Sequence, residues 1–190
     1  KKKVEIIKTD ISKNKNIEKY FKGVDFVFHL AGIADIVPSI ENPKKYFNSN
    51  VMGTLNVLEA IKKNKIKKLI YSASASCYGI PKEYPTKENS TINPMYPYAF
   101  TKWQGEKLIT HWSKIYNIPY ISLRFFNAYG PRSRTTGVYG AVFGVFLAQR
   151  LANRPLTIIG DGQQTRDFIY VSDLVEGIYK AAKSNKQNKI

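Results

Sequence analysis

The sequence predicts an α/β fold, in which a parallel β-sheet carries helices on both of its faces. Short apolar runs alternate along the chain with longer segments whose apolar residues recur at helical spacing. This alternation is typical of parallel sheets. The run Val24–Leu30 is apolar at most of its positions, as expected of a strand that is buried on both faces.

The elements of the first part of the chain follow in order. Strands are predicted for the apolar runs at residues 4–7, 24–30, 68–72 and 119–124. Helices are predicted between them, over residues 12–21, 42–64 and 96–116. The second of these helices has the clearest pattern, because its apolar residues share one face: Val51, Leu55, Leu58 and Ile61.

After Asn127 the alternation loosens, and Gly130-Pro131-Arg132 reads as a turn. Helices are predicted over residues 140–153 and 171–183, and strands over residues 156–159 and 168–169. The first of these strands stops at Gly160-Asp161-Gly162. We place a domain boundary near residue 130 and expect substrate-binding elements after it.

Length and composition limit the class of protein. The chain has 190 residues, enough for one domain and part of a second, and 43% of them are apolar. It contains no apolar run of about 18 residues, so no membrane span is expected. The N-terminus lacks the apolar stretch of a secretory signal, and Cys77 is the only cysteine. These features predict a cytoplasmic protein.

The formal net charge of +16 raises the question of nucleic acid. Only 6 of the 30 basic residues are arginines, and the lysines are scattered along the whole chain. Nucleic-acid sites usually cluster basic residues on one face and use arginine. We therefore expect no nucleic-acid partner, although a positive potential would attract an anionic substrate such as a diphosphate.

The central chemical signal is Tyr98-Ala-Phe-Thr-Lys102. The four-residue spacing places both side chains on one helix face. A phenol has a pKa of about 10, and a nearby cation lowers it, so Tyr98 could exchange a proton with a sugar hydroxyl. By itself such a pair is also typical of a solvated helix face. Small hydroxyl residues at the end of a predicted strand, Ser72, Ser74 and Ser76, support a site.

Four motifs in order resemble the extended short-chain dehydrogenase/reductase family, in its nucleotide-sugar epimerase/dehydratase branch. They are Ser72-x-Ser74-x-x-x-Tyr-Gly79, Tyr98-x-x-x-Lys102, Arg124-Phe-Phe-Asn127-Ala-Tyr-Gly-Pro-Arg132 and Gly160-Asp-Gly-x-x-Thr-Arg166-Asp167. The resemblance implies a Rossmann-like doubly wound sheet and a partial smaller substrate-binding domain. Residues 1–130 would be the dinucleotide-binding domain and residues 131–190 part of the nucleotide-sugar-binding region.

The resemblance also implies a bound NAD. The family's glycine-rich first turn and first two strands have no counterpart in this sequence, so the chain is expected to be a fragment. Asp10 and Ile11 would contact the adenine end, and Asn50 and Phe126 the nicotinamide end. The full set of cofactor-binding residues implied in this way is Asp10, Ile11, Leu30, Ala31, Gly32, Asn50, Ser72, Tyr98, Lys102 and Phe126.

The catalytic residues implied by the resemblance are Ser74, Tyr98 as acid/base and Lys102. A nucleotide-diphosphate sugar, by default a UDP-sugar, is the implied substrate. Its diphosphate would be gripped by Asn127 and Arg166, since an arginine fork suits phosphate oxygens. Substrate contacts are expected from Ser74, Asn127, Phe143, Thr157 and Arg166. Near Phe143 no amide side chain is present to bind the base.

Within this branch, the local residues favour a 4-epimerase. Dehydratases and decarboxylases carry an acid directly after the catalytic serine or threonine, where this chain has Ala75 and Ser76. Epimerase-reductases use a cysteine at the position of Ser76, and Cys77 is interpreted as core packing. The alternatives are a nucleotide-sugar 4-reductase, a dehydratase, a 2-epimerase or a non-catalytic NAD-binding regulator.

Two further expectations concern metals and partners. His29 lies in a predicted strand and His111 on a predicted helix. Both are interpreted as structural, so no metal is expected. The helices over residues 42–64 and 96–116 match those that pair two subunits in the family, so the resemblance implies a homodimer.

Overall fold

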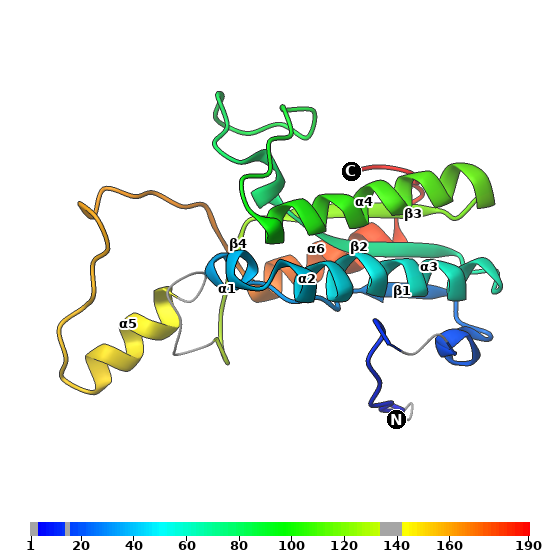
Figure 1. Ribbon diagram of the computed structural model, residues 1–190, viewed down its shortest axis with the longest axis horizontal. Coiled ribbons are helices and arrows are strands. Elements are labelled where there is room, and N and C mark those ends of the chain that lie inside the picture. The colour runs from blue at the N-terminus through cyan, green and yellow to red at the C-terminus, as the bar shows by residue number, and fades with distance from the viewer. Residues whose placement is uncertain (1–3, 14–15, 134–141) are drawn as a thin grey trace.

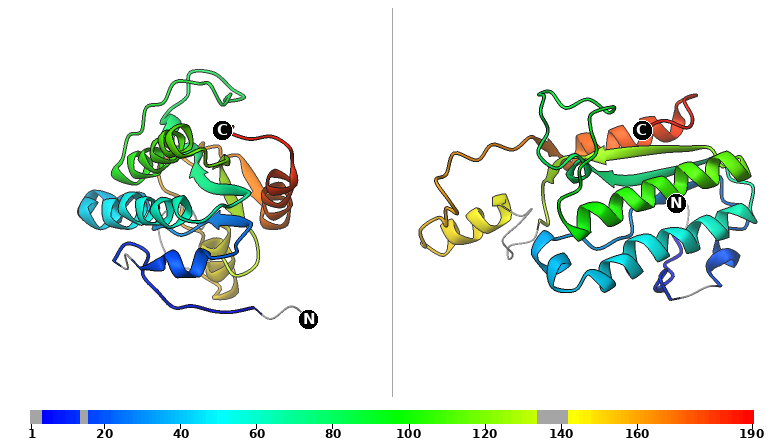
Figure 2. Two further views of the ribbon diagram at one scale, coloured as in Figure 1. Left: turned by 90° about the vertical axis from the view of Figure 1, so that its right-hand side faces the viewer. Right: turned by 45° about the horizontal axis from the view of Figure 1, so that its top comes forward.

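The computed structural model describes residues 4–13, 16–133 and 142–190. Its centre is a parallel sheet of β1 (Phe26–His29), β2 (Lys68–Ser74) and β3 (Tyr120–Phe125), in the order β1-β2-β3. Helices α3 (Gly53–Lys62) and α4 (Pro97–Tyr116) cover one face, and α6 (Val171–Lys183) covers the other (Figures 1 and 2). The predicted fold class is confirmed.

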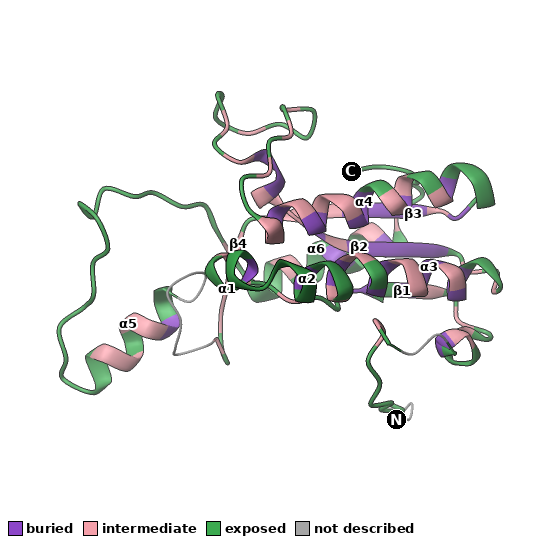
Figure 3. Ribbon diagram, in the orientation of Figure 1, coloured by how far each residue is buried: buried purple, intermediate pink, exposed green. Residues whose placement is uncertain are grey.

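The core fills both sides of β2. Successive side chains of a strand point to opposite faces. Leu69 and Tyr71 therefore pack in the cluster with α3 and α4, and Ile70 packs against Ile178 of α6. All three β2 side chains are at most 1% exposed, and Figure 3 shows β2 as a buried strand between half-buried helices.

The predicted helix over residues 42–64 is present as three consecutive pieces. They are α2 (Pro43–Tyr46), a π-helical turn at Phe47–Met52 and α3. Asn42 caps the start, because its Oδ1 accepts the Lys45 N–H at 3.2 Å and Pro43 occupies the first position. A short helix before it, α1 (Ile36–Glu41), was not predicted.

Helix α4 confirms the helix predicted over residues 96–116. Pro97 begins it, and Asn117, with φ of 53°, ends it in the left-handed conformation. Gly105 allows the helix to lie close to the sheet. A Cβ atom at this position would collide with the Tyr71 hydroxyl of β2.

Beyond β3 the chain builds a second, two-stranded parallel sheet from β4 (Asn127–Tyr129) and β5 (Phe168–Tyr170). In the sequence, α5 (Val142–Leu151) comes between these two strands; in space, it extends away from the central sheet (Figure 1). It confirms the helix predicted over residues 140–153 where that segment is described. The last predicted helix, residues 171–183, is α6.

Three local predictions are wrong. Residues 156–159 are not a strand, because no other strand of the described chain lies beside them and Ile158 is 67% exposed. The run Val4–Ile7 likewise forms no strand, and Ile6 is 90% exposed. Of the helix expected over residues 12–21, the described part is helical only as a 3₁₀ turn, η1 (Ile17–Phe21), held by a single buried side chain, Ile17.

Candidate active site

Ser74, Tyr98 and Lys102 meet at the carboxyl ends of the parallel strands. Ser74 is the last residue of β2, and Tyr98 and Lys102 lie in the first turns of α4. Ser74 also caps the 3₁₀ turn η3 (Ala75–Tyr78), since its Oγ accepts the Ser76 N–H at 3.2 Å and lies 2.7 Å from the Ser76 Oγ. The Ser74 hydroxyl also interacts with the Tyr98 phenol and lowers its pKa. The structure therefore brings the three predicted residues together.

Lys102 holds its ammonium group inside the protein. The residue is 5% exposed, and its Nζ lies 4.6 Å from the centroid of the Tyr71 ring. The Tyr71 hydroxyl donates a hydrogen bond to the Lys102 carbonyl at 3.2 Å. Burial lowers the pKa of Lys102 to about 8, because removal from water disfavours the charged form. The contact with the aromatic face favours the ammonium.

Tyr98 differs from the expectation. Burial raises the pKa of its phenol, the Asp35 carboxylate raises it further, and the hydrogen bond from Ser74 opposes both. The expected lowering of the Tyr98 pKa is wrong for the chain as described. The net shift is upward, because burial of the phenol is its largest cause.

A cavity of about 140 Å³ opens beside Tyr98 and Lys102. Its lining residues are Leu30, Gly32, Ile33, Ala34, Ser72, Tyr98 and Lys102. Five of them belong to the predicted cofactor set, and Ala31 lies in the same turn. Ile33 and Ala34 were not predicted, although they directly continue the turn Leu30-Ala31-Gly32 that follows β1.

Asn50 supports the wall of this cavity from behind. It is 2% exposed. Its Oδ1 accepts the Ile33 N–H at 2.8 Å, and its Nδ2 donates to the Ile33 carbonyl and to the Thr101 Oγ1, both at 3.0 Å. These hydrogen bonds join the turn after β1 to α4. In the described chain the Asn50 amide thus holds the turn, and its contact with the nicotinamide end stays a prediction.

Other predicted cofactor residues lie apart from the cavity. Asp10 accepts hydrogen bonds from the Ser12 N–H and hydroxyl at 2.9 and 2.7 Å. The Ile11 carbonyl accepts the Asn56 side-chain amide at 2.8 Å, which attaches this turn to α3. Phe126 is 42% exposed and lines a second cavity, of about 350 Å³, along β3 and α6.

The predicted substrate-binding residues that follow β3 do not lie together at one site. Asn127 donates from Nδ2 to the Asp167 carbonyl at 2.9 Å, which joins β4 to the chain entering β5. Phe143 stacks on Tyr129 with ring centroids 4.8 Å apart. Thr157 exchanges two hydrogen bonds with Gln149, and Arg166 is exposed and donates to the neighbouring Thr165 carbonyl. None of these four residues lines either cavity. Most of the chain from α5 to β5 is exposed (Figure 3).

Among the described residues, no group of three or more His, Cys, Asp or Glu side chains is placed to hold a metal ion. His29 is buried, and its Nε2 lies 2.8 Å from the Thr54 Oγ1. Burial lowers the pKa of His29 to about 3, and the Lys102 charge adds to this effect.

In the described chain no helix combines the length and apolarity needed to cross a membrane.

The fold and the site together define a class of protein. A parallel sheet with its ligand cavity at the carboxyl ends of the strands is typical of nucleotide-binding α/β proteins. A phenol, a hydroxyl and a buried ammonium beside that cavity are suited to proton exchange with a bound alcohol. The sequence matches the model of the NAD dependent epimerase/dehydratase family over residues 1–190. The chain belongs to this family, whose cofactor is the expected NAD.

Curated relatives and solved structures agree with this assignment. A UDP-glucose 4-epimerase of Mycolicibacterium smegmatis is 34% identical over 158 residues, which are 83% of this chain and 50% of the relative. A UDP-N-acetylglucosamine 4-epimerase of Methanobrevibacter ruminantium, solved with UDP-N-acetylmuramic acid, is 36% identical with a TM-score of 0.92. That match covers 97% of this chain and 59% of the other.

A UDP-glucuronic acid 4-epimerase of Bacillus cereus, solved with UDP-glucuronic acid and NAD, is also 36% identical, with a TM-score of 0.86. The match covers 94% of this chain and 55% of the other. The chain spans about half the length of the curated relatives that it matches.

Proposed function

We propose that this chain is the catalytic part of an NAD-dependent nucleotide-sugar 4-epimerase. The observation that supports it most is that Tyr98 and Lys102 line the cavity at the strand ends, with Ser74 close to Tyr98. Tyr98, as the phenolate, takes the proton of the sugar 4-hydroxyl while C4 gives up its hydride, which leaves a 4-keto sugar. The keto sugar turns over in the site, the hydride returns to its other face, and Tyr98 returns the proton to the oxygen. Ser74 orients that hydroxyl. NAD, when bound, supplies reversible storage of the hydride from C4.

The residues present fit such a cofactor. The turn after β1 lines the cavity, and Gly32 lets this turn pack closely against Asn50 and Lys102. A Cβ atom on Gly32 would lie 3.0 Å from the Asn50 Oδ1 and 3.8 Å from the Lys102 Nζ. Lys102, buried beside this turn, would donate to the hydroxyls of a ribose. Its charge would also stabilise the Tyr98 phenolate during proton transfer.

The residues after Ser74 favour epimerisation over the other reactions of the family. Ala75 has no acidic group, and Ser76 is engaged with Ser74 through both its N–H and its hydroxyl. Cys77 is 2% exposed, and burial raises its pKa to about 11, so the thiol stays protonated at neutral pH. No side chain here supplies the second acid or base that elimination requires.

A UDP-sugar is the proposed substrate, because the relatives described above are named for UDP-sugars. We propose that the region after residue 130 closes over it, with Asn127 and Arg166 on the diphosphate and Phe143 and Thr157 near the nucleoside. The positive net charge would help to attract a diphosphate. A cytoplasmic homodimer that pairs through α3 and α4 is part of the same proposal.

The decisive experiment uses the full-length gene product with bound NAD. UDP-glucose, UDP-glucuronate and UDP-N-acetylglucosamine, each deuterated at C4, are incubated separately without reductant. A 4-epimerase yields the C4 epimer with the deuterium retained at C4 and no net NADH. Net loss of added NADH would indicate a 4-reductase, and inversion at C2 would indicate a 2-epimerase. A protein that binds NAD and converts none of the sugars would contradict the proposal.

A further inference from the structure

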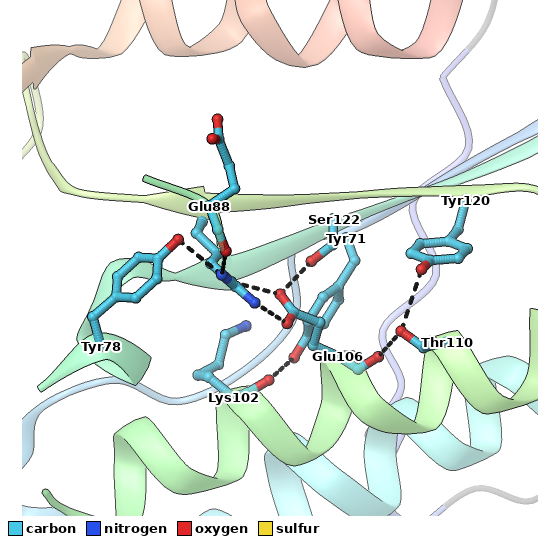
Figure 4. A network of polar contacts seen from close by, with 9 residues as sticks. Tyr71, Tyr78, Glu88, Lys102, Glu106, Thr110, Tyr120 and Ser122 are labelled. Atoms are coloured by element: carbon cyan, nitrogen blue, oxygen red, sulfur yellow. Dashed lines mark hydrogen bonds and ion pairs between the residues drawn. The ribbon is translucent and has the colours of Figure 1, made fainter. Parts of the chain in front are cut away.

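A buried ion pair lies one helical turn beyond Lys102 and has no place in the proton-transfer scheme. Arg124 of β3 and Glu106 of α4 form a two-pronged contact, with the Arg124 Nε 3.1 Å from Glu106 Oε2 and the second prong 2.6 Å from Oε1. Their side chains are 7% and 1% exposed. The Ser122 hydroxyl donates to the same carboxylate at 2.8 Å (Figure 4).

The other side of the guanidinium holds the segment that follows Ser74. Its remaining terminal nitrogen donates to the Tyr78 hydroxyl and to the Glu88 carbonyl, both at 2.8 Å. The guanidinium also lies over the Tyr78 ring, 4.9 Å from its centroid. Tyr78 is the last residue of η3, the turn that Ser74 begins. Glu88 lies in the connection from η3 to α4 (Figure 4).

Glu106, the carboxylate of the pair, lies on the same helix as Tyr98 and Lys102. Glu106 follows Lys102 by four residues and Tyr98 by eight, so the three share one face of α4. One planar guanidinium therefore fixes the helix that carries Tyr98 and the turn that carries Ser74. Its fork geometry gives direction as well as attraction.

Such a pair is poorly explained by stability alone. Removing two charges from water costs about as much as their attraction returns, and apolar residues of similar size often stabilise a fold as well. A fixed geometry is what the polar pair adds. We propose that Arg124, acting through Glu106 and Tyr78, is a positioning residue that holds Ser74 beside Tyr98. This inference rests on the proposed function of Tyr98 as acid/base.

Tyr78→Phe is the test variant, because it removes one oxygen atom and keeps the ring. Tyr120→Phe is the matched control. Both tyrosines are 4% exposed, and the Tyr120 hydroxyl lies 3.3 Å from the Thr110 Oγ1, on the far side of Glu106 from the site (Figure 4). In the full-length enzyme, Tyr78→Phe should lower kcat roughly tenfold with KM nearly unchanged. Tyr120→Phe should change kcat less than twofold at a similar loss of stability.

A second readout does not depend on turnover. The titration of Tyr98 is followed by NMR of the full-length protein labelled with ¹³Cζ-tyrosine, with its signal assigned from Tyr98→Phe. Because the hydrogen bond with Ser74 lowers the pKa of Tyr98, its weakening in Tyr78→Phe should raise that pKa, and Tyr120→Phe should not. Equal behaviour of the two variants would overturn the proposal. A raised pKa in a protein that converts no sugar would support the positioning role and contradict the proposed function instead.

Discussion

Lys102, to which we assign a role in the site, is buried at a cost in stability. Its ammonium is buried, and the pKa is lowered from 10.5 to about 8. At neutral pH the folded protein keeps the charged form, which burial disfavours. We predict that Lys102→Met raises the free energy of unfolding at pH 7 by about 3 kcal/mol while abolishing turnover. Chemical denaturation of both proteins measures the difference.

The pH dependence gives an internal check on that prediction. Between pH 8 and 10.5 the folded protein loses the Lys102 proton while the unfolded chain keeps it, so stability rises with pH in this window. The advantage of Lys102→Met should therefore shrink as the pH rises from 8 to 10.5. A constant advantage would mean that packing of the methionine, and not the charge, causes the effect.

Tyr98→Phe should lower kcat by about 100-fold or more, the usual cost of losing a general acid/base. The phenylalanine keeps the ring, which packs edge-on against Tyr46 with centroids 6.5 Å apart, so the fold and bound NAD should be retained. Steady-state kinetics and NAD released on denaturation measure the two properties. Turnover close to that of the native enzyme would show that another group carries the proton.

The spacing of Tyr98 and Lys102 predicted that the two share one face of α4, and the resemblance added Ser74; their catalytic roles stay a proposal. The sequence could not predict the sign of the Tyr98 pKa shift, since that depends on burial by residues far away in the chain. Nor did it predict the direction of the Asn50 amide, which depends on the path of the turn after β1. Glu106 could have been found, because it extends the Tyr98–Lys102 spacing by four more residues on an otherwise buried face.

The packing of α4 on β2 depends on Gly105. A methyl group there would meet the Tyr71 hydroxyl, which lies in the fully buried layer. We predict that Gly105→Ala destabilises the protein by about 1–3 kcal/mol, as overpacking does, and weakens activity through Lys102. Thermal and chemical unfolding measure this effect.

Gly177 of α6 provides the control for that variant. It is also a helical glycine, and a Cβ atom there would have no neighbour within 4 Å. Gly177→Ala should therefore be neutral or stabilise by up to about 1 kcal/mol, through helix propensity. If both alanine variants had the same effect, crowding at Tyr71 would not be the cause.

Elements with a strong apolar pattern were predicted well, and those that depend on a neighbour were not. Helix α4 and strand β2 are buried along their whole apolar faces, so their own residues determine them. The segment at residues 156–159 has the composition of a strand, yet strands need a partner to satisfy their backbone groups. The π-helical turn at Phe47–Met52 has no apolar pattern of its own and arises within an otherwise regular helix.

His29 links the stability of the whole molecule to acid. Its pKa is about 3 in the folded protein against 6.5 in the unfolded chain, so the unfolded chain binds the proton first as the pH falls. The contribution of His29 to the free energy of unfolding is fully present above pH 6.5. It is lost as the pH falls from 6.5 to 3, which lowers the free energy of unfolding by about 5 kcal/mol. His29→Gln, which can keep the contact with Thr54, should lose this part of the acid sensitivity.

The chain contains only one other histidine, His111, and it is exposed. His111→Gln is therefore the matched control, and its acid unfolding should follow that of the native protein. The measurement is the free energy of unfolding at a series of pH values from 7 to 3. If all three proteins lost stability in parallel, the acid sensitivity would belong to other groups.

The sheet and both helical layers followed from the alternation of apolar runs, because that pattern is set by local sequence. The arrangement of the residues after β3 did not follow from this pattern. Asn127, Phe143, Thr157 and Arg166 belong to a long segment that contributes little to the buried core. Their side chains contact other residues of that same segment, such as Asp167, Tyr129 and Gln149. A motif identifies such residues, but only contacts with a ligand or with further chain would bring them together.

The parallel pair β4–β5 joins residues 127–129 directly to residues 168–170. Everything between them is therefore inserted at a single point beyond the end of β3. If this insert closes over the nucleotide part of the substrate, as we propose, it could be exchanged between two family members without disturbing Ser74, Tyr98 or Lys102. Substrate specificity could then change in evolution within this one insert, while the catalytic chemistry stays the same.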